Sequence, residues 1–450
     1  MTDSRETTPG WVEHYRQRTV NHEAAIAKIS PGDSVFSTLG HNVDSIVAGL
    51  IGRGIPISFT ITTGPDLDWL TPDLAENFRI NTYFATVGSR DALNAFLGDY
   101  TPWWVWGAHK ALEEGRRGAK TIDVSLVRVS PPNNAGWCCL GNSLWDVRTT
   151  ASYAKTTIAV VSDDVMHTFG DTWIPATDID WFVEEEPATP PDAESAARWR
   201  NHLLAQADDT TNSAIAGHIA ALVRDGDAIQ IGTGTTTSSL VISGALDAKN
   251  DLGYFAELAV PGAIDLALRG VITSKYLARH PGRFVTTMAV GLPHETAALN
   301  ENPMFEFYGV DYVHNPTAIA KNDNLIAVNQ ALTVDLTGQI AAGQFGSKIW
   351  SGTGGQFSYA LGAFMSKGGR SVTVIPSTAQ KGTVSRIVAE MPQGQIVTIP
   401  RDIADTVVTE YGVAELLNKT QKERAWALIE IAHPEFRDDL RSEAKRLFGA

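Results

Sequence analysis

A glycine-containing loop between a predicted strand and a predicted helix is the first place in this sequence where backbone groups could do chemistry. The strand AIQIG (228–232) runs directly into GTGTTTSSL (232–240). Backbone N–H groups in such a loop can point at a phosphate or at a negatively charged oxygen. The loop does not match a dinucleotide fingerprint, because Thr237 stands where the third glycine should be, and no Gly-Lys-Ser/Thr follows as in a Walker loop. By itself, it indicates either an anion-binding turn or an ordinary tight turn.

Residues that usually mark metal centres and hydrolytic triads do not form the required patterns. The 11 histidines lack H-E-x-x-H spacing, and the two cysteines are adjacent at Cys138 and Cys139. We therefore expect no metal site and no disulfide framework, and we expect both cysteines to be buried as small hydrophobic residues. The sequence also contains no G-x-S-x-G elbow, which removes the usual serine hydrolases from consideration.

The elements that must position such a loop follow from the pattern of apolar residues. Short apolar runs alternate with amphipathic stretches, which is typical of α/β domains with buried parallel strands. The pattern predicts helices at 44–50 and 211–224. It predicts strands at 55–62, 120–130, 155–162, 228–232, 371–376, 395–399 and 405–409. The acidic, proline-containing segment 184–199 is unsuited to a strand or helix interior in its first half, so we place a domain boundary there, between residues 1–187 and 188–450.

The composition restricts the partners of this protein. Among 450 residues, 36 Lys and Arg stand against 51 Asp and Glu, which gives a formal net charge of −15. This excess of negative charge disfavours nucleic acids and anionic membrane surfaces as partners. The sequence has no apolar run of about 18 residues, and its first ten residues lack the apolar region of a signal peptide. We expect a cytoplasmic enzyme that acts on small molecules.

Several blocks after the glycine loop occur in an order that carries a family resemblance. They are IAALVRDGDAIQIGTG (219–234), YFAELAVPG (254–262), NPMFEF (302–307), VNQALTVDLTGQ (328–339), SGTGGQ (351–356), PSTA (376–379) and VVTEYGVAEL (407–416). With looser matches in the amino-terminal half, the chain resembles the acetyl-CoA hydrolase/transferase family over nearly its whole length. The resemblance implies an α/β fold of two similar open domains in tandem, an active site in the cleft between them, and a homo-oligomer such as a dimer.

The resemblance also implies a mechanism through a catalytic glutamate, which falls on Glu257. The alternative is a solvated surface carboxylate, but the apolar neighbours Phe255, Leu258 and Val260 do not suit a freely exposed loop. In this family's mechanism, the carboxylate attacks an acyl-CoA, and the CoA thiolate then forms a thioester with the glutamate. An acceptor carboxylate later resolves the thioester, and proximity supplies much of the catalysis.

The remaining site residues follow from the same resemblance. The backbone N–H groups of Thr233 and Gly355 match the family's donors to an oxyanion, and Glu410 matches a second carboxylate of the active site. Asn315 matches an asparagine near the catalytic glutamate, with an Asn-Pro turn as the alternative. Coenzyme A, bound as acyl-CoA, is the cofactor that the resemblance implies. Candidates to bind it are Gly232, Gly234 and Gly354, together with Lys367 and Arg370, which are otherwise surface charges.

Some positions around the presumed site depart from the family pattern. An Asp-Phe pair and an arginine of the family pattern are replaced by Ser358, Tyr359 and Leu361. Separately, the tryptophan-rich segment 103–106 either lines an apolar acyl site or packs in a core. We expect a CoA-transferase that acts on a small or medium carboxylate. The alternatives are an acyl-CoA hydrolase, an enzyme of other acyl-CoA chemistry, and a CoA-ester-binding regulator without turnover.

Overall fold

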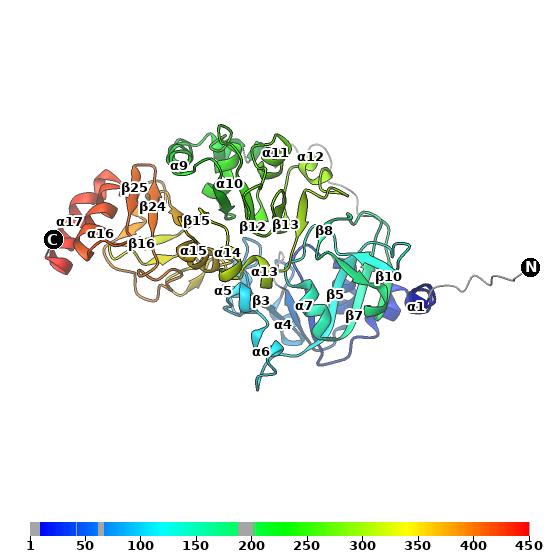
Figure 1. Ribbon diagram of the computed structural model, residues 1–450. Helices are drawn as coiled ribbons and strands as arrows, with labels where there is room; N and C mark the ends of the chain where they lie inside the picture. Colours follow the sequence, from blue (N-terminus) through cyan, green and yellow to red (C-terminus); the bar gives the residue numbers. More distant parts are fainter. Residues whose placement is uncertain (1–9, 42, 62–66, 188–200, 203, 450) are drawn as a thin grey trace, which may run out of the picture.

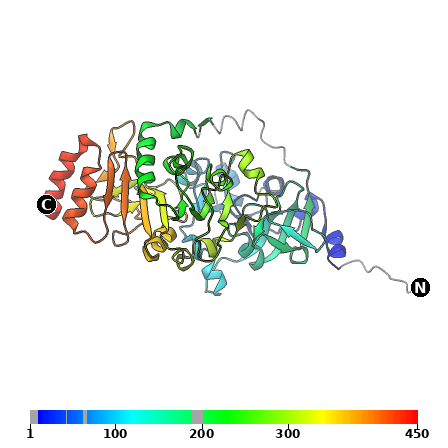
Figure 2. The same ribbon diagram turned by 45° about the horizontal axis from the view of Figure 1, so that its top comes forward.

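The protein consists of two α/β halves, each built around one large sheet (Figure 1). The computed structural model describes residues 10–41, 43–61, 67–187, 201–202 and 204–449. Helices α1 (Gly10–Arg18) and α17 (Arg437–Phe448) lie at opposite ends of an elongated molecule in both views (Figure 1, Figure 2). The halves therefore follow one another along the chain and in space, as the resemblance implied.

The first half contains a seven-stranded sheet in the order β10-β7-β5-β1-β2-β3-β4. Every neighbouring pair in it is parallel. Three predicted strands, at 55–62, 120–130 and 155–162, are confirmed as β2, β5 and β7, whose near-continuous apolar runs suit a sheet covered on both faces. The strands are β1 (Ser34–Ser37), β2 (Ile57–Ile61), β3 (Phe78–Thr82), β4 (Gly98–Tyr100), β5 (Ile122–Val129), β7 (Ala154–Val161) and β10 (Trp181–Glu184).

Short helices connect these strands. The predicted helix at 44–50 is confirmed as α3 (Asp44–Arg53). It is capped by Gly54 in the left-handed region (φ 61°), where glycine has no Cβ to strain the backbone. The connecting helices also include α2 (His22–Ile26), α4 (Pro72–Asn77), α5 (Arg90–Asn94), α6 (Lys110–Glu113) and α7 (Val147–Tyr153). A two-stranded antiparallel ribbon pairs β6 (Trp137–Cys139) with β9 (Trp173–Pro175).

The second half contains a nine-stranded sheet in the order β25-β24-β20-β15-β11-β12-β13-β14-β8. Its neighbouring strands are parallel except for the antiparallel pair β24–β25. The strands are β8 (Phe169–Gly170), β11 (Ala228–Ile231), β12 (Gly253–Ala259), β13 (Phe284–Ala289), β14 (Phe305–Phe307), β15 (Ile326–Gln330), β20 (Arg370–Val374), β24 (Thr406–Thr409) and β25 (Gly412–Glu415). Strand β8 thus precedes the predicted boundary in sequence but extends the second sheet. Residues 188–200, next to that boundary, lie outside the described residues.

Helices and small sheets complete the second half. The helices are α9 (Thr210–Leu222), α10 (Thr235–Ile242), α11 (Ala263–Leu268), α12 (Pro293–Ala297), α13 (Val310–Val313), α14 (Pro316–Ile319), α15 (Gln356–Met365), α16 (Gln421–Glu430) and α17. The small strands are β16 (Thr333–Asp335), β17 (Ile340–Ala341), β18 (Gln344–Phe345), β19 (Lys348–Ile349), β21 (Thr378–Ala379), β22 (Val384–Ser385) and β23 (Ile387–Val388). Within the described ranges, no helix is long and apolar enough to cross a membrane.

One predicted strand is wrong. Residues 395–399 form a loop in which only Ile399 makes an isolated bridge, to Ile340. Both Thr398 and Ile399 donate their backbone N–H to the carbonyl oxygen of Ile340, at 2.8 and 3.0 Å. This shared acceptor ends the pairing after one residue. Thr398 and Ile399 are buried by these contacts, whereas Ile396 is 57% exposed, so the apolar run belongs to no ladder.

A continuous apolar core joins the two halves. Leu140 and Val161 of the first half belong to the same buried cluster as Ala289 and Phe307 of the second. Backbone bonds cross the same interface, since Leu144 N–H donates to the carbonyl of Thr287 at 2.8 Å. Within this region the two cysteines are free and buried. The shared core holds the two sheets in one arrangement and allows a site to be built from both.

Candidate active site

Glu257 lies near the carboxyl end of β12 and faces a cavity between the two halves. The other residues of β12 are buried, whereas the Glu257 side chain keeps 15% of its surface exposed. The cavity is bordered by the loop after β11, by the last two residues of β15, by the glycine segment before α15, and by Phe84, which follows β3. Because the carboxyl ends of parallel strands gather their following loops at one edge, this is where ligands bind in open α/β sheets.

Two donors hold one oxygen of the Glu257 carboxylate. Its Oε2 accepts the backbone N–H of Gly355 at 2.9 Å and a hydrogen bond from Nε2 of His314 at 2.9 Å. Within the described part of the chain, Oε1 receives no hydrogen bond from the protein. An ionised carboxylate can only accept, so the proton of the His314 ring must be on Nε2. The arrangement fixes the carboxylate through one oxygen and leaves the other available.

His314 is completely buried between two aromatic rings. The ring centroids of Trp145 and Tyr359 lie 6.1 and 5.5 Å from that of the histidine, and both rings approach it edge-on. The Tyr359 hydroxyl donates to the carbonyl oxygen of Val313 at 3.1 Å. Burial, reinforced by the negative charge of Glu257, raises the pKa of Tyr359 well above its ordinary value. The tyrosine therefore stays neutral and continues to donate, which fixes the chain beside His314.

The glycine segment before α15 must lack side chains to reach Glu257. A Cβ atom added at Gly355 would lie 2.4 Å from Oε2 of Glu257 and 2.5 Å from the His314 ring. Gly354 has φ +52°, a conformation that glycine adopts without strain. Because α15 begins at Gln356, the N–H of Gly355 is one of the helix-end donors that lack an intrahelical partner. The amino end of the helix also favours a negative charge.

The glycine loop after β11 forms the other side of the cavity. Gly232 and Thr233 border it together with Glu257. A Cβ atom at Gly232 would lie 2.5 Å from Oδ1 of Asn329, and one at Gly234 would lie 2.4 Å from Oε1 of Gln330. Both glycines are therefore required for the close approach of β15. The structure thus brings five predicted site residues together: Gly232, Thr233, Glu257, Gly354 and Gly355.

Asn315 does not orient Glu257 in this structure. Its Oδ1 accepts the backbone N–H of Thr317 at 2.9 Å and the Thr317 hydroxyl at 2.7 Å, which caps α14. The preceding residue, His314, bonds Glu257 instead. The turn-forming alternative from the Asn-Pro sequence therefore describes Asn315.

Glu410 follows β24, four strands from β12 in the sheet order, and does not border the cavity. One of its oxygens accepts the backbone N–H of Ser377 at 2.9 Å, and the other accepts the Ser377 hydroxyl. With strands about 4.8 Å apart, four strand spacings put β24 roughly 19 Å from β12. Glu410 thus lies on the same sheet edge as Glu257 but at a distance.

Lys367 and Arg370 lie at the opposite edge of the sheet. Both are at the amino end of β20, where the Lys367 carbonyl accepts the N–H of Asn324, just before β15. The Arg370 guanidinium pairs with the buried carboxylate of Asp227 and donates to the carbonyl of Leu222 at 2.9 Å. The structure therefore separates these two cations from the cavity, and the assignment of CoA binding to them is not retained.

Sequence reasoning missed two residues of the cavity region, His314 and Phe84. His314 stands in the HNP triplet that drew attention to Asn315, so the signal was present but was assigned to the neighbouring residue. Phe84 follows β3, a strand of the other half that the sequence analysis did not predict, and nothing in its local sequence indicates a site. In the described part of the chain, no three His, Cys, Asp or Glu side chains are grouped to hold a metal ion.

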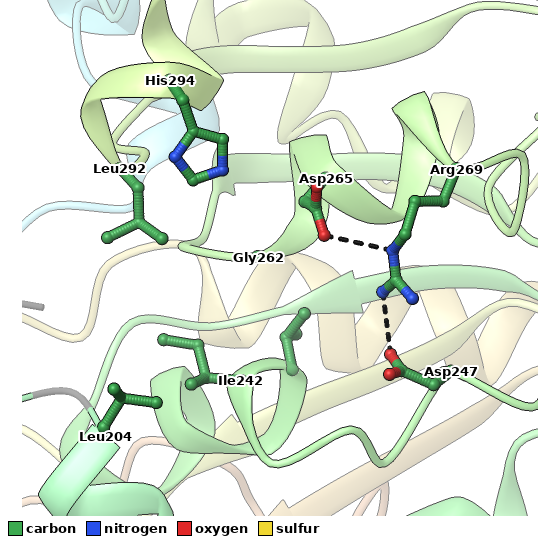
Figure 3. Close-up of a pocket in the computed structure, with 9 residues that line it drawn as sticks. Leu204, Ile242, Asp247, Gly262, Asp265, Arg269, Leu292 and His294 are labelled. Atoms are coloured by element: carbon green, nitrogen blue, oxygen red, sulfur yellow. Dashed lines mark hydrogen bonds and ion pairs between the residues drawn. The ribbon is translucent and has the colours of Figure 1, made fainter.

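A second, larger cavity of about 380 Å³ lies near α10, α11 and α12 (Figure 3). Its one arginine, Arg269, forms ion pairs with Asp247 and Asp265, at 2.9 and 3.1 Å. The two carboxylates neutralise the guanidinium, so the described residues that line this cavity include no uncommitted lysine or arginine for an anionic ligand. The cavity at Glu257, with its oriented carboxylate, is the stronger candidate for catalysis.

Comparison with known proteins identifies the family to which this chain belongs. The N-terminal domain of the acetyl-CoA hydrolase/transferase family matches residues 55–190, and its C-terminal domain matches residues 292–444. A 4-hydroxybutyrate coenzyme A transferase of Clostridium kluyveri is 37% identical over 444 residues, which cover 97% of this chain and 100% of the relative. The chain belongs to the acetyl-CoA hydrolase/transferase family. A second family member, the succinyl-CoA:cyclohexane-1-carboxylate CoA transferase of Geobacter metallireducens, is 32% identical over 99% of both chains.

Solved structures in this family share the fold along nearly the whole chain. RipA from Yersinia pestis superposes with a TM-score of 0.85 at 28% identity, covering 98% of this chain and 99% of its own. A 4-hydroxybutyrate CoA-transferase from Porphyromonas gingivalis superposes with a TM-score of 0.74 at 28% identity, covering 97% of this chain and all of its own. The predicted family and the predicted two-domain α/β fold are thereby confirmed.

Proposed function

We propose that this protein transfers coenzyme A from an acyl-CoA to a carboxylic acid through a thioester on Glu257. The observation that carries the proposal is the Glu257 carboxylate, which is held through Oε2 by Gly355 and His314 and keeps Oε1 available inside a cavity. The names of the family relatives, which are CoA transferases, support the same reaction class.

The reaction proceeds by four exchanges at carbonyl carbons. Oε1 of Glu257 attacks the acyl carbonyl and the C–S bond breaks, which releases the CoA thiolate and leaves a mixed anhydride between Glu257 and the acyl group. The thiolate attacks the Glu257 carbonyl carbon and releases the first carboxylate, which leaves a glutamyl-CoA thioester. An acceptor carboxylate attacks this thioester, breaks its C–S bond and forms a second mixed anhydride with release of the thiolate. The thiolate then attacks the acceptor's carbonyl carbon, which forms the new acyl-CoA and frees the Glu257 carboxylate. No net proton is consumed, and no water is required.

The donors around Glu257 suit the charge that develops in these steps. When the thiolate attacks the glutamyl carbonyl, Oε2 becomes an oxyanion already bonded to Gly355 N–H and His314. Donors fixed before the reaction need no reorganisation, and losing one typically costs about 2.7–4 kcal/mol. The N–H of Thr233, on the opposite side of the cavity, is proposed to serve the acyl carbonyl. Gly232, Gly234 and Gly354 are proposed as the backbone positions along which the CoA arm approaches.

The test is intact-mass spectrometry after mixing the protein with acetyl-CoA and no acceptor. We expect a mass increase equal to one CoA joined with loss of water, and we expect none in Glu257→Ala. A Glu301→Ala variant removes a glutamate whose side chain is 72% exposed and does not border the cavity, so it should form the adduct normally. An adduct that persists in Glu257→Ala would contradict the assignment.

The same preparation separates transfer from hydrolysis. Free CoA and acyl products are measured with and without a carboxylate acceptor. A transferase gives a new acyl-CoA in proportion to the acceptor, with little free CoA. Rapid release of free CoA that does not depend on the acceptor would instead identify an acyl-CoA hydrolase.

A further inference from the structure

One aromatic side chain of the first half reaches the cavity of Glu257. Among the described residues that border this cavity, Phe84 is the one from the first half, and the others belong to the second. Most of those others are glycines or carry amide and hydroxyl groups, such as Thr233, Gln330 and Thr353. The cavity therefore has polar walls on the side of Glu257, and the aromatic ring of Phe84 forms an apolar wall that the first half contributes.

The Phe84 ring lies directly against the glycine segment that holds Glu257. A Cβ atom on Gly354 would lie 3.5 Å from Cε2 of the ring, and one on Gly352 would lie 2.6 Å from its Cδ2. The same Gly354 position lies 3.6 Å from Oε1 of Glu257. The phenyl ring and the available carboxylate oxygen thus border the same small space.

The backbone around Phe84 is fixed before any substrate arrives. The Thr82 hydroxyl donates to the Phe84 carbonyl at 3.1 Å and accepts the Phe84 N–H at 3.3 Å. The neighbouring Tyr83 ring stacks on Trp103, with centroids 4.2 Å apart and planes at 13°. The sequence analysis gave the tryptophan segment two alternative roles, lining an acyl site or packing in a core. In the structure Trp103 packs on Tyr83, the residue next to Phe84.

We propose that Phe84 is the wall on which the hydrocarbon part of the acyl group packs, and that it selects short-chain aliphatic acyl-CoA substrates. The inference rests on the proposed function, because it assumes that the acyl carbonyl is attacked by Glu257. With its carbonyl oxygen toward the backbone donors of the second half, an acyl group at Oε1 directs its tail toward the ring. An apolar tail gains by leaving water there, whereas the other walls are formed mostly by glycines and polar side chains.

The size of the cavity sets the length of the tail. The cavity has a volume of about 90 Å³. One water needs about 10–15 Å³ of such space, so the cavity is small. The thioester and its attacking groups use part of it. A short acyl chain therefore fills the remainder, and a longer chain meets the Phe84 ring.

The experiment measures kcat/KM for acetyl-CoA, butyryl-CoA and octanoyl-CoA with a common acceptor. The wild-type protein should favour the two short substrates over octanoyl-CoA. Phe84→Ala should raise the octanoyl-to-acetyl ratio of kcat/KM at least tenfold, and Phe84→Trp should lower the rate with butyryl-CoA more than that with acetyl-CoA. Phe96→Ala, which removes a phenylalanine that is 93% exposed in the same half, should leave the profile unchanged.

Adduct formation with acetyl-CoA is recorded for every variant, so that two failures can be told apart. If the wild-type protein forms no glutamyl-CoA adduct, the proposed function fails and this inference fails with it. If the adduct forms but Phe84→Ala leaves the octanoyl-to-acetyl ratio within twofold, only the role of Phe84 is overturned. Should Phe84→Ala not fold, Phe84→Leu, which keeps an apolar side chain of smaller width, replaces it with the same expected direction. A wild-type preference for octanoyl-CoA also overturns the inference.

Discussion

The bond between His314 and Glu257 gives the most direct test of how this site is organised. The change we consider is His314→Leu, which keeps an apolar group between the rings of Trp145 and Tyr359 but removes the donor to Oε2. His314→Gln serves as the matched variant, because its terminal amide nitrogen can occupy nearly the position of Nε2. The Gly355 N–H remains in both proteins.

The expected magnitude follows from the geometry of this contact. The donor lies 2.9 Å from a carboxylate oxygen and is completely buried. A hydrogen bond to a charged group contributes about 1.5–3 kcal/mol, and loss of a donor to a developing oxyanion costs about 2.7–4 kcal/mol. His314→Leu should therefore lower kcat by roughly 10²–10³, since about 1.4 kcal/mol corresponds to tenfold. His314→Gln should retain activity to within about one order of magnitude.

The assay is acyl-CoA formation from acetyl-CoA and butyrate, together with the rate at which the adduct appears in rapid-quench mass spectra. Thermal unfolding of each variant shows whether the fold is kept. A folded His314→Leu protein whose kcat stays within threefold of wild type would refute the role of the His314 donor in catalysis. Equal losses of activity in the leucine and glutamine variants would also refute it, because the glutamine variant keeps a donor at nearly the same position.

Three further outcomes are expected. Gly355→Ala should lower kcat at least about 10²-fold, because its Cβ would lie 2.4 Å from the carboxylate oxygen that the Gly355 N–H holds. Gly217→Ala, whose Cβ meets nothing within 4 Å, should stay active, and steady-state kinetics compare the two variants. Burial lowers the pKa of His41 below its ordinary value near 6.5, so the unfolded chain takes up the proton first as the pH falls. The free energy of unfolding should therefore decrease below about pH 6.5, by up to about 1.4 kcal/mol per pH unit, and urea titrations should show a shallower decrease in His41→Gln. Asp227→Ala leaves the Arg370 guanidinium without its buried partner and should cost about 3–5 kcal/mol of stability in urea unfolding. The adduct stoichiometry of the folded fraction should remain normal, because this pair lies at the amino edge of the sheet.

Much of the fold could be predicted from local patterns. Helix α9 and strands β2, β5, β7, β11, β20 and β24 appear where apolar periodicity indicated them, because each is set by burial along a short stretch of chain. The run at 395–399 could not be distinguished from a strand by its apolar residues, although only its end is buried, where Ile399 bridges Ile340. Strand β8 was also invisible, because two residues carry no periodicity.

Ordered motifs and apolar periodicity predicted the family, the two-domain α/β architecture and the candidate nucleophile Glu257, because both are properties of the chain read in one dimension. The groups that surround that carboxylate could be identified only once the chain was folded. His314 is 57 residues away from Glu257 along the chain, and Gly355 is 98 residues away. Phe84 comes from the other half, while Lys367 and Arg370 are carried to the far edge by the direction of β20. These choices depend on strand order and on how two sheets pack through one apolar core, and neither is encoded in the spacing of residues near any single motif.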